Sequence, residues 1–156
     1  GNVKAIQLKC IGELAKRIAA TSRREQITLQ SAKSIAEYFM EQLRHETQEH
    51  LMLAMFDNTI MLIGEKLLST GTSNAALISA RDIYRTALQY QAAYVVVLHN
   101  HPSGNPEPSR EDILVTRKIK ACGELLDILL MDHIIIGDNR YFSFREQDIL
   151  FEKGRD

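Results

Sequence analysis

Apolar residues recur at helical spacing over two stretches near the start of the chain. Between residues 3 and 20 they recur at roughly helical spacing, at Val3, Ile6, Leu8, Ile11, Leu14, Ala15 and Ile18. The polar run from Thr21 to Arg24 interrupts this pattern, and a second stretch with helical spacing covers residues 31–44. The sequence therefore predicts two helices ahead of the first strand.

The pattern changes from helix to strand near residue 49. Residues 50–56 form a nearly continuous apolar run that ends at Asp57 and Asn58, a pair typical of turns, and residues 60–63 are apolar again. This arrangement predicts a β-hairpin. Residues 94–98 are apolar on both faces, which is typical of a central strand that is covered on both sides.

The remaining segments alternate between helix and strand. Helices are predicted over residues 80–91 and 110–126, and strands over residues 128–136 and 141–144. The full order is then α-α-β-β-α-β-α-β-β. Such an order predicts an α/β fold in which helices sandwich a mixed β-sheet, preceded by N-terminal helices.

Composition limits the classes of protein that this chain can represent. Its 156 residues suit one domain with a small appendage, and 45% hydrophobic with 25% charged residues is typical of a globular protein. The net charge of −1 indicates no basic surface for coating nucleic acid. No apolar run approaches the roughly 20 residues that span a bilayer, and no signal peptide is recognised. We therefore expect a cytoplasmic protein, with Cys10 and Cys122 reduced.

Two histidines at the end of the central predicted strand carry the clearest chemical signal. His99 and His101 lie two residues apart, so in extended backbone their side chains point the same way. Asp112 follows eleven residues after His101, just inside the next predicted helix. Two imidazoles and one carboxylate leave a fourth position open, as in catalytic zinc sites. Ligands of open α/β sheets also bind beyond the carboxyl ends of the strands.

The same residues have a purely structural interpretation. Ser109 and Asp112 form an S-x-x-D capping box, in which the serine caps the helix and the aspartate reaches back. A histidine at a strand end is also often only structural. The two interpretations of Ser109 are compatible, because a capping hydroxyl at the rim of a site can also face outward.

The spacing of these residues resembles that of a known family. HNHPSG, followed by Ser109 and Asp112, reproduces H-x-H-x7-S-x2-D, the motif of the JAMM (MPN-type) metalloproteases. The segments LHNHPSGNPEPSREDILVTRKI and MDHIIIGDNRYFSFRE resemble bacterial RadC-type proteins, and the resemblance covers residues 48–147. Residues 1–22 resemble the end of that family's helix-hairpin-helix module, which leaves residues 23–156 as the JAMM/MPN domain.

The resemblance implies a cytidine-deaminase-like α/β fold that binds a zinc ion (Zn2+). In that family pattern His99, His101 and Asp112 are the metal ligands, and Ser109 supports the oxyanion of the tetrahedral intermediate. The pattern also implies a catalytic glutamate from the predicted hairpin, which acts as a general base on water.

Glu65 is the candidate for that glutamate in this chain. It lies one position before the place where the family pattern expects the residue, which is Lys66 here. A shift of one residue reverses the face of a strand, although a β-bulge restores it. The alternative is that Glu65 is a solvated carboxylate at a strand end.

The sequence thus leads to two functional hypotheses. The first is a zinc-dependent hydrolase of peptide or isopeptide bonds, whose partner is a protein or peptide substrate. The alternative is a non-catalytic, metal-stabilised binding module associated with DNA repair or replication, with nucleic acid bound only through the incomplete N-terminal module. A nucleobase deaminase is excluded because the chain has neither H-x-E nor P-C-x-x-C. Asp132 and His133 are predicted to be structural, with support of the metal site as the alternative.

Overall fold

The computed structural model describes residues 1–24, 31–71 and 79–150, and these ranges contain four helices and five strands. The helices are α1 (Asn2–Arg24), α2 (Ala32–Leu43), α3 (Ala80–Gln89) and α4 (Arg110–Leu126). The strands are β1 (Glu49–Phe56), β2 (Leu62–Gly71), β3 (Tyr94–Asn100), β4 (Leu129–Ile136) and β5 (Tyr141–Ser143). Their order along the chain is the one predicted from the hydrophobic pattern.

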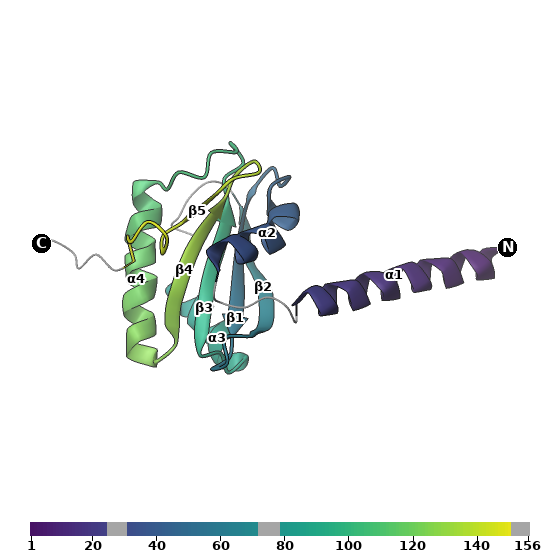
Figure 1. Cartoon of the computed structure of the whole chain (residues 1–156), viewed down its shortest axis with the longest axis horizontal. Helices are drawn as coiled ribbons and strands as arrows, with labels where there is room; N and C mark the ends of the chain where they lie inside the picture. Colours follow the sequence, from purple (N-terminus) through teal and green to yellow (C-terminus); the bar gives the residue numbers. More distant parts are fainter. Residues whose placement is uncertain (25–30, 72–78, 151–156) are drawn as a thin grey trace, which may run out of the picture.

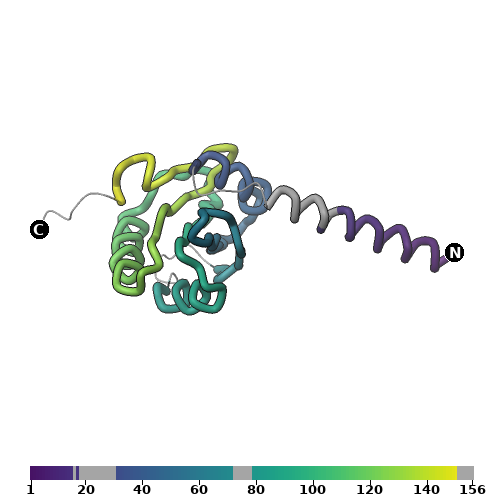
Figure 2. The backbone as a smooth tube through the Cα atoms, turned by 60° about the horizontal axis from the view of Figure 1, so that its bottom comes forward, coloured from purple at the N-terminus to yellow at the C-terminus, as the bar shows by residue number. Residues whose placement is uncertain are grey.

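The strands form one mixed sheet in the order β2-β1-β3-β4-β5. β3 pairs with β4 in parallel, and the other three pairs are antiparallel. Helix α2 lies on one face of this sheet, and α3 and α4 lie on the other (Figures 1 and 2). The predicted α/β sandwich around a mixed sheet is therefore confirmed.

Alternation along the strands divides the core into two layers. In β1, Leu51, Leu53 and Met55 pack with α3 and α4, whereas the residues between them pack with α2. β3 alternates in the same way, with Val95 and Val97 on the α3–α4 side. Because cross-strand partners share a face, this parity tells which face each side chain of the sheet occupies.

The structure extends two of the predicted strands. β2 runs from Leu62 to Gly71, well past the predicted end at residue 63, because its polar second half pairs with β1 as far as Glu49. β3 continues through His99 to Asn100, because these residues pair with β4. The central strand thus carries the first histidine itself.

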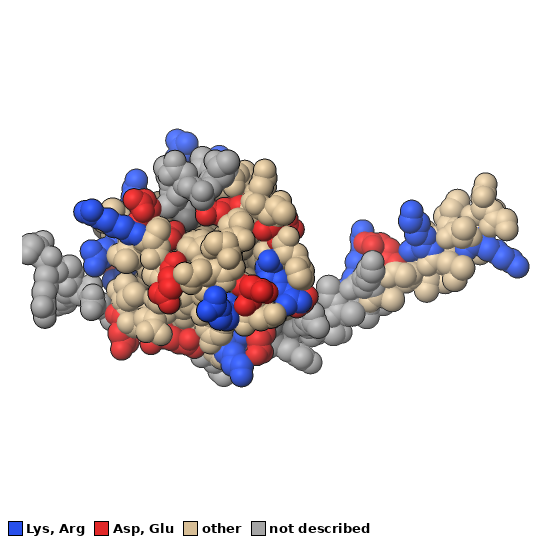
Figure 3. Space-filling model, turned by 90° about the horizontal axis from the view of Figure 1, so that it is seen from above, with Lys and Arg blue, Asp and Glu red and all other residues tan. Residues whose placement is uncertain are grey.

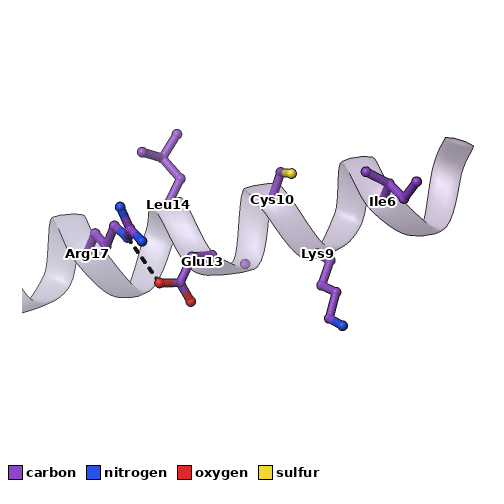
Figure 4. A pocket seen from close by; sticks show the side chains of 7 residues that line it. Ile6, Lys9, Cys10, Glu13, Leu14 and Arg17 are labelled. Carbon is purple, nitrogen blue, oxygen red and sulfur yellow. Dashed lines mark hydrogen bonds and ion pairs between the residues drawn. The ribbon is translucent and has the colours of Figure 1, made fainter.

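Helix α1 stands away from the sheet domain (Figure 1). Its apolar side chains at Val3, Ile6, Leu8, Ile11 and Leu14 are 58–70% exposed. Figure 4 shows how some of them line a shallow hollow beside the Glu13–Arg17 ion pair, whose atoms lie 3.0 Å apart. The assignment of residues 1–22 to a helix-hairpin-helix remnant stays a prediction.

Two further sequence expectations concern residues that the structure describes. Among the described helices, none has both the length and the apolar character needed to cross a membrane. Cys10 is exposed and Cys122 is half-buried, and neither is joined in a disulfide.

Truncation of Phe39 should test the packing of α2 on the sheet. Its ring is fully buried in the layer between α2 and the strands. We expect Phe39→Ala to lower the free energy of unfolding by about 3–5 kcal/mol, measured by urea denaturation. Leu125→Ala is the matched control, since Leu125 is 86% exposed, and it should change stability by less than about 0.5 kcal/mol. Equal losses in the two variants would contradict this account of the core.

Candidate metal centre

The candidate centre lies where β3 ends and α4 begins. His99 sits in β3 opposite Leu51 of β1, and His101 follows just after the strand. Asp112 is the third residue of α4, which packs on the same face of the sheet as His99. His99 and Asp112 are each only 3% exposed, whereas His101 is half-buried. The cluster is therefore reached from the side of His101.

The three side chains converge at distances that suit a metal ion. The Nε2 atoms of His99 and His101 lie 3.1 Å apart. Asp112 Oδ1 lies 3.4 Å from Nε2 of His99, and Oδ2 lies 3.5 Å from Nε2 of His101. Zinc–ligand bonds of about 2.0–2.1 Å in tetrahedral geometry place the ligand atoms about 3.3 Å apart. The predicted ligands are thus brought together in an arrangement that fits a divalent ion.

The hydrogen bonding of His101 agrees with that arrangement. Its Nδ1 lies 2.9 Å from the carbonyl oxygen of Asn105, which can only accept, so Nδ1 carries the hydrogen. In the neutral ring Nε2 then has a free lone pair that faces Nε2 of His99 and the carboxylate of Asp112. Acceptors that face each other in this way are stabilised by a cation between them.

The pKa directions follow from burial and from mutual contact. Burial lowers the pKa of His99 to about 4, so this ring is neutral at pH 7. The contact with Asp112 raises the pKa of His101. Burial opposes ionisation of Asp112, but the contacts with His101, His99 and Ser109 together hold its pKa well below the usual range. An ionised carboxylate is therefore retained at this largely buried position.

A short loop fixes the position of His101. Its N–H donates to the carbonyl of Ile136 at the end of β4, and its own carbonyl accepts from the N–H of Gly104, both at 2.9 Å. Gly104 has φ of +79°, and a Cβ there would lie 3.2 Å from the Cβ of Asp138. Glycine is the residue that adopts this conformation without strain, which explains its place in the loop after the histidines.

Ser109 forms the capping box that the sequence offered as an alternative. Its hydroxyl donates to Oδ2 of Asp112 over 2.6 Å and accepts from the Asp112 N–H over 3.1 Å. The Asp112 carboxylate also accepts from the N–H of Ser109. The hydroxyl hydrogen of Ser109 is thus held by Asp112, and a role at a substrate oxyanion would require the hydroxyl to turn away from that carboxylate.

Strand pairing does not bring Glu65 to the cluster. Glu65 is paired with Ala54, which is paired on its other side with Val96. Ala54 and Val96 both pack with α2, whereas His99 lies on the α3–α4 face. The bulge between Leu51 and Met52 lies farther along β2 and leaves this pairing unchanged. The proposed role of Glu65 at the metal therefore has no support in its position.

Glu49 is the carboxylate that the sequence reasoning missed. The antiparallel register ends at the pair of Leu51 with His99, and its continuation by two residues places Glu49 opposite His101 on the same face of the sheet. Burial raises the pKa of Glu49, and the charges of His101 and Asp112 act on it in opposite directions. Alternation along residues 49–56 predicts that Glu49 and Leu51 face the same side of the sheet. The residues of β3 that lie opposite them cannot be predicted from the sequence.

Asn100, between the two histidines, holds the backbone on either side of Glu49. Its side-chain oxygen accepts from the N–H of His50 over 2.7 Å, and its amide donates to the carbonyl of Gln48 over 3.0 Å. Asn100 is almost completely buried. This amide therefore fixes the start of β1 relative to the end of β3.

Asp132 and His133 have separate environments. Asp132 accepts from the hydroxyl of Ser143 over 2.6 Å and from the N–H of Arg145 over 3.0 Å, and burial raises its pKa to about 6. His133 is fully buried, and its Nε2 lies 2.8 Å from Nδ1 of His99. Asp132 thus holds β5 and Arg145 against β4 through hydrogen bonds, whereas His133 contacts the predicted metal ligand His99.

Comparison with known proteins agrees with this fold and this cluster. Residues 29–149 match the family model described as the RadC-like JAB domain. The chain belongs to the RadC-like JAB family. The predicted RadC-type resemblance is therefore confirmed, and the matched residues include all three candidate metal ligands.

The curated relatives in this family share most of the chain. A UPF0758 protein of Thermotoga maritima is 43% identical over 147 residues, which are 94% of this chain and 66% of that protein. UPF0758 proteins of Clostridium novyi and Bacillus velezensis are 39% and 38% identical over 150 residues. Those alignments cover 96% of this chain and 66% and 65% of the relatives. The chain thus spans just under two thirds of the length of these relatives.

The pKa directions predict how metal affinity changes with pH. A metal must displace the proton from His101, whose pKa is raised, whereas His99 is already neutral above about pH 5. The affinity for zinc should therefore rise about tenfold per pH unit from pH 5 to beyond pH 6.5, and level off only above the raised pKa of His101. Competition with a chromophoric chelator across this range would measure it.

The exposed His45 provides the control for that titration. His45→Ala should leave both the affinity and its pH profile unchanged, and His101→Ala should remove most of the affinity. A rise of about a hundredfold per pH unit would mean that two protons are displaced, which would contradict the assignment of His99 as neutral.

Proposed function

We propose that the chain is a zinc-dependent hydrolase of peptide or isopeptide bonds. The observation that carries this proposal is the convergence of two imidazoles and one carboxylate at the end of β3, with Glu49 opposite His101. Four-coordinate zinc bound by three protein ligands keeps one position for water or substrate. The RadC-like JAB family match supports a metal centre at these residues.

The chemistry of the proposal is amide hydrolysis. A zinc ion held by His99, His101 and Asp112 would supply a Lewis acid that polarises the substrate carbonyl and acidifies water. The Glu49 carboxylate accepts a proton from the attacking water while the oxygen of that water bonds to the carbonyl carbon. Glu49 then delivers the proton to the leaving nitrogen as the C–N bond breaks. Water thus contributes its hydroxyl group to the acyl product and its hydrogen to the amine.

Position favours Glu49 over Glu65 for this role. Glu49 lies on the face of the sheet that carries both histidines, and its pKa is raised by burial toward the range of a useful general base. Glu65 lies on the opposite face, against the α2 layer. The role of Ser109 at the oxyanion remains part of the proposal and requires its hydroxyl to leave Asp112.

No specific observation favours nucleic acid as the ligand of the sheet domain. Lysine and arginine side chains are interspersed with aspartate and glutamate over the face shown in Figure 3. The net charge of the whole chain is −1. We propose a protein or peptide as the substrate, and a reducing compartment such as the cytoplasm suits the two unpaired cysteines.

The paired variants Glu49→Gln and Glu65→Gln test the proposal. The wild-type chain loaded with zinc should cleave members of a panel of quenched fluorescent peptides and isopeptides. Glu49→Gln should lower kcat by a factor of about 100 or more, because it removes the general base. Glu65→Gln should retain the wild-type rate. Elemental analysis should find about one zinc per chain in all three proteins.

A different experimental result would contradict each of the three parts of this proposal: hydrolysis, the identity of the general base, and zinc binding. No cleavage of any peptide by chain with full zinc occupancy would count against hydrolysis but leave the metal site standing. Loss of activity in Glu65→Gln with a normal rate in Glu49→Gln would restore the assignment made from the sequence. Absence of zinc from the wild type, even after addition of the metal, would overturn the whole proposal.

A further inference from the structure

A chain of buried polar contacts joins the backbone of Asp112 to the ring of His99. The carbonyl oxygen of Asp112 lies 2.5 Å from Oγ1 of Thr116, which lies 2.6 Å from Nδ1 of His133. Nε2 of His133 lies 2.8 Å from Nδ1 of His99. Thr116 and His133 are both buried, so no bulk water competes for these contacts.

Counting hydrogens along this chain gives one arrangement. A carbonyl oxygen has no hydrogen, so the one hydroxyl hydrogen of Thr116 points to Asp112. Thr116 must then accept the hydrogen from Nδ1 of His133. With that hydrogen on Nδ1, a neutral His133 ring has a lone pair on Nε2 and accepts from the Nδ1–H of His99. His99 is left with a lone pair on Nε2, the atom that faces His101 and Asp112.

Both rings are neutral in this arrangement for a geometric reason. They are almost fully buried, and they contact one another through ring nitrogens. The His133 ring contacts Thr116 and stacks on the ring of Phe144, with the two ring planes 11° apart. In the described part of the chain, the His133 ring forms no hydrogen bond or ion pair with a carboxylate. Burial and the neighbouring His99 ring therefore outweigh the attraction of the Asp112 charge, and a positive charge on His133 is disfavoured.

We propose that Thr116 and His133 are positioning residues that hold His99 in the tautomer whose Nε2 can bind the metal. This inference rests on the proposed metal site and adds two residues that do not touch the ion. Asp112 acts at both ends of this series of hydrogen bonds. Its carboxylate is a proposed metal ligand, and its backbone carbonyl sets the direction in which each hydrogen in the series points. In the other tautomer the Nε2 atom of His99 carries hydrogen and cannot ligate.

Thr86 offers a matched control for Thr116. Its hydroxyl donates to the carbonyl of Asp82 four residues earlier in α3, just as Thr116 donates to Asp112 in α4. Thr86 is also buried. The two threonines differ in one respect: among the described contacts, the hydroxyl of Thr116 also contacts a histidine ring, whereas that of Thr86 does not. Removal of the Thr86 hydroxyl therefore reports the effect on a helix alone, whereas removal of the Thr116 hydroxyl reports that effect together with the effect on His133.

The first experiment reads the tautomers directly in the metal-free wild-type chain. Two-bond ¹H–¹⁵N correlation spectra of ¹⁵N-labelled histidine distinguish a ring protonated at Nδ1 from one protonated at Nε2. We expect both His99 and His133 to carry hydrogen on Nδ1 at pH 7.5. A His99 ring protonated at Nε2 would overturn the inference, and this result needs no variant to fold.

The second experiment measures zinc affinity in three variants by chelator competition. Thr116→Val keeps the shape of the side chain but removes the acceptor for His133, so it should weaken zinc binding by roughly 10- to 100-fold. Thr116→Ser, which restores a hydroxyl, and Thr86→Val should both bind zinc like the wild type. The spectrum of Thr116→Val should also show His99 with hydrogen shifted to Nε2.

The outcomes separate this inference from the proposed function. Equal zinc affinity in Thr116→Val and wild type, with the His99 tautomer unchanged, would remove the positioning role while leaving the metal site intact. An equal loss in Thr86→Val would mean that the effect is structural and would also overturn it. Failure of the wild type to bind zinc would overturn the proposed hydrolase, whereas the tautomer spectra would still decide the arrangement of hydrogens.

Discussion

The pairing of β3 with two neighbours of opposite direction determines which side chains meet at its carboxyl end. The antiparallel register with β1 brings Glu49 opposite His101, and the parallel register with β4 brings His133 to the His99 side. Each neighbour thus brings a candidate side chain for the site from a different part of the sequence. Hydrogen-bonded strands lie about 4.8 Å apart, so a side chain beyond the immediate neighbour would be too far away to act on the same ion.

Alternation then gives the last residues of β3 two separate tasks. His99 and His101 face the α3–α4 layer and converge with Asp112, whereas Asn100 between them makes its hydrogen bonds to the backbone on either side of Glu49. The strand end therefore presents the candidate metal ligands on one face, and its intervening residue Asn100 holds the start of β1. A chain that kept the histidines but lost Asn100 would retain the ligands without the contact that fixes Glu49.

The order of elements and the cluster of candidate metal ligands could be predicted because both depend on short-range patterns. Helical spacing, strand alternation and the two-residue spacing of the histidines are properties of local sequence, and the HxHx7SxxD motif carries Asp112 with them. The position of Glu49 depends on the register between β1 and β3, two strands that are far apart in the sequence. Face parity is sensitive to a shift of one residue, and the pairing of Glu65 with Ala54 faces it toward the α2 layer rather than toward the histidines.

The energetics of the cluster explain why its supporting contacts are so complete. An ionised Asp112 and a neutral His99 that are both almost fully buried would each destabilise the fold if left unpaired. Ser109 donates to Asp112 with its N–H and its hydroxyl, and His133 lies within hydrogen-bonding distance of His99. These contacts satisfy the outer sides of the two ligands and leave their inner atoms directed at one point. The region around α4 and β4 therefore directs acceptors toward a cation position beside the apolar layer between the sheet and α3 and α4.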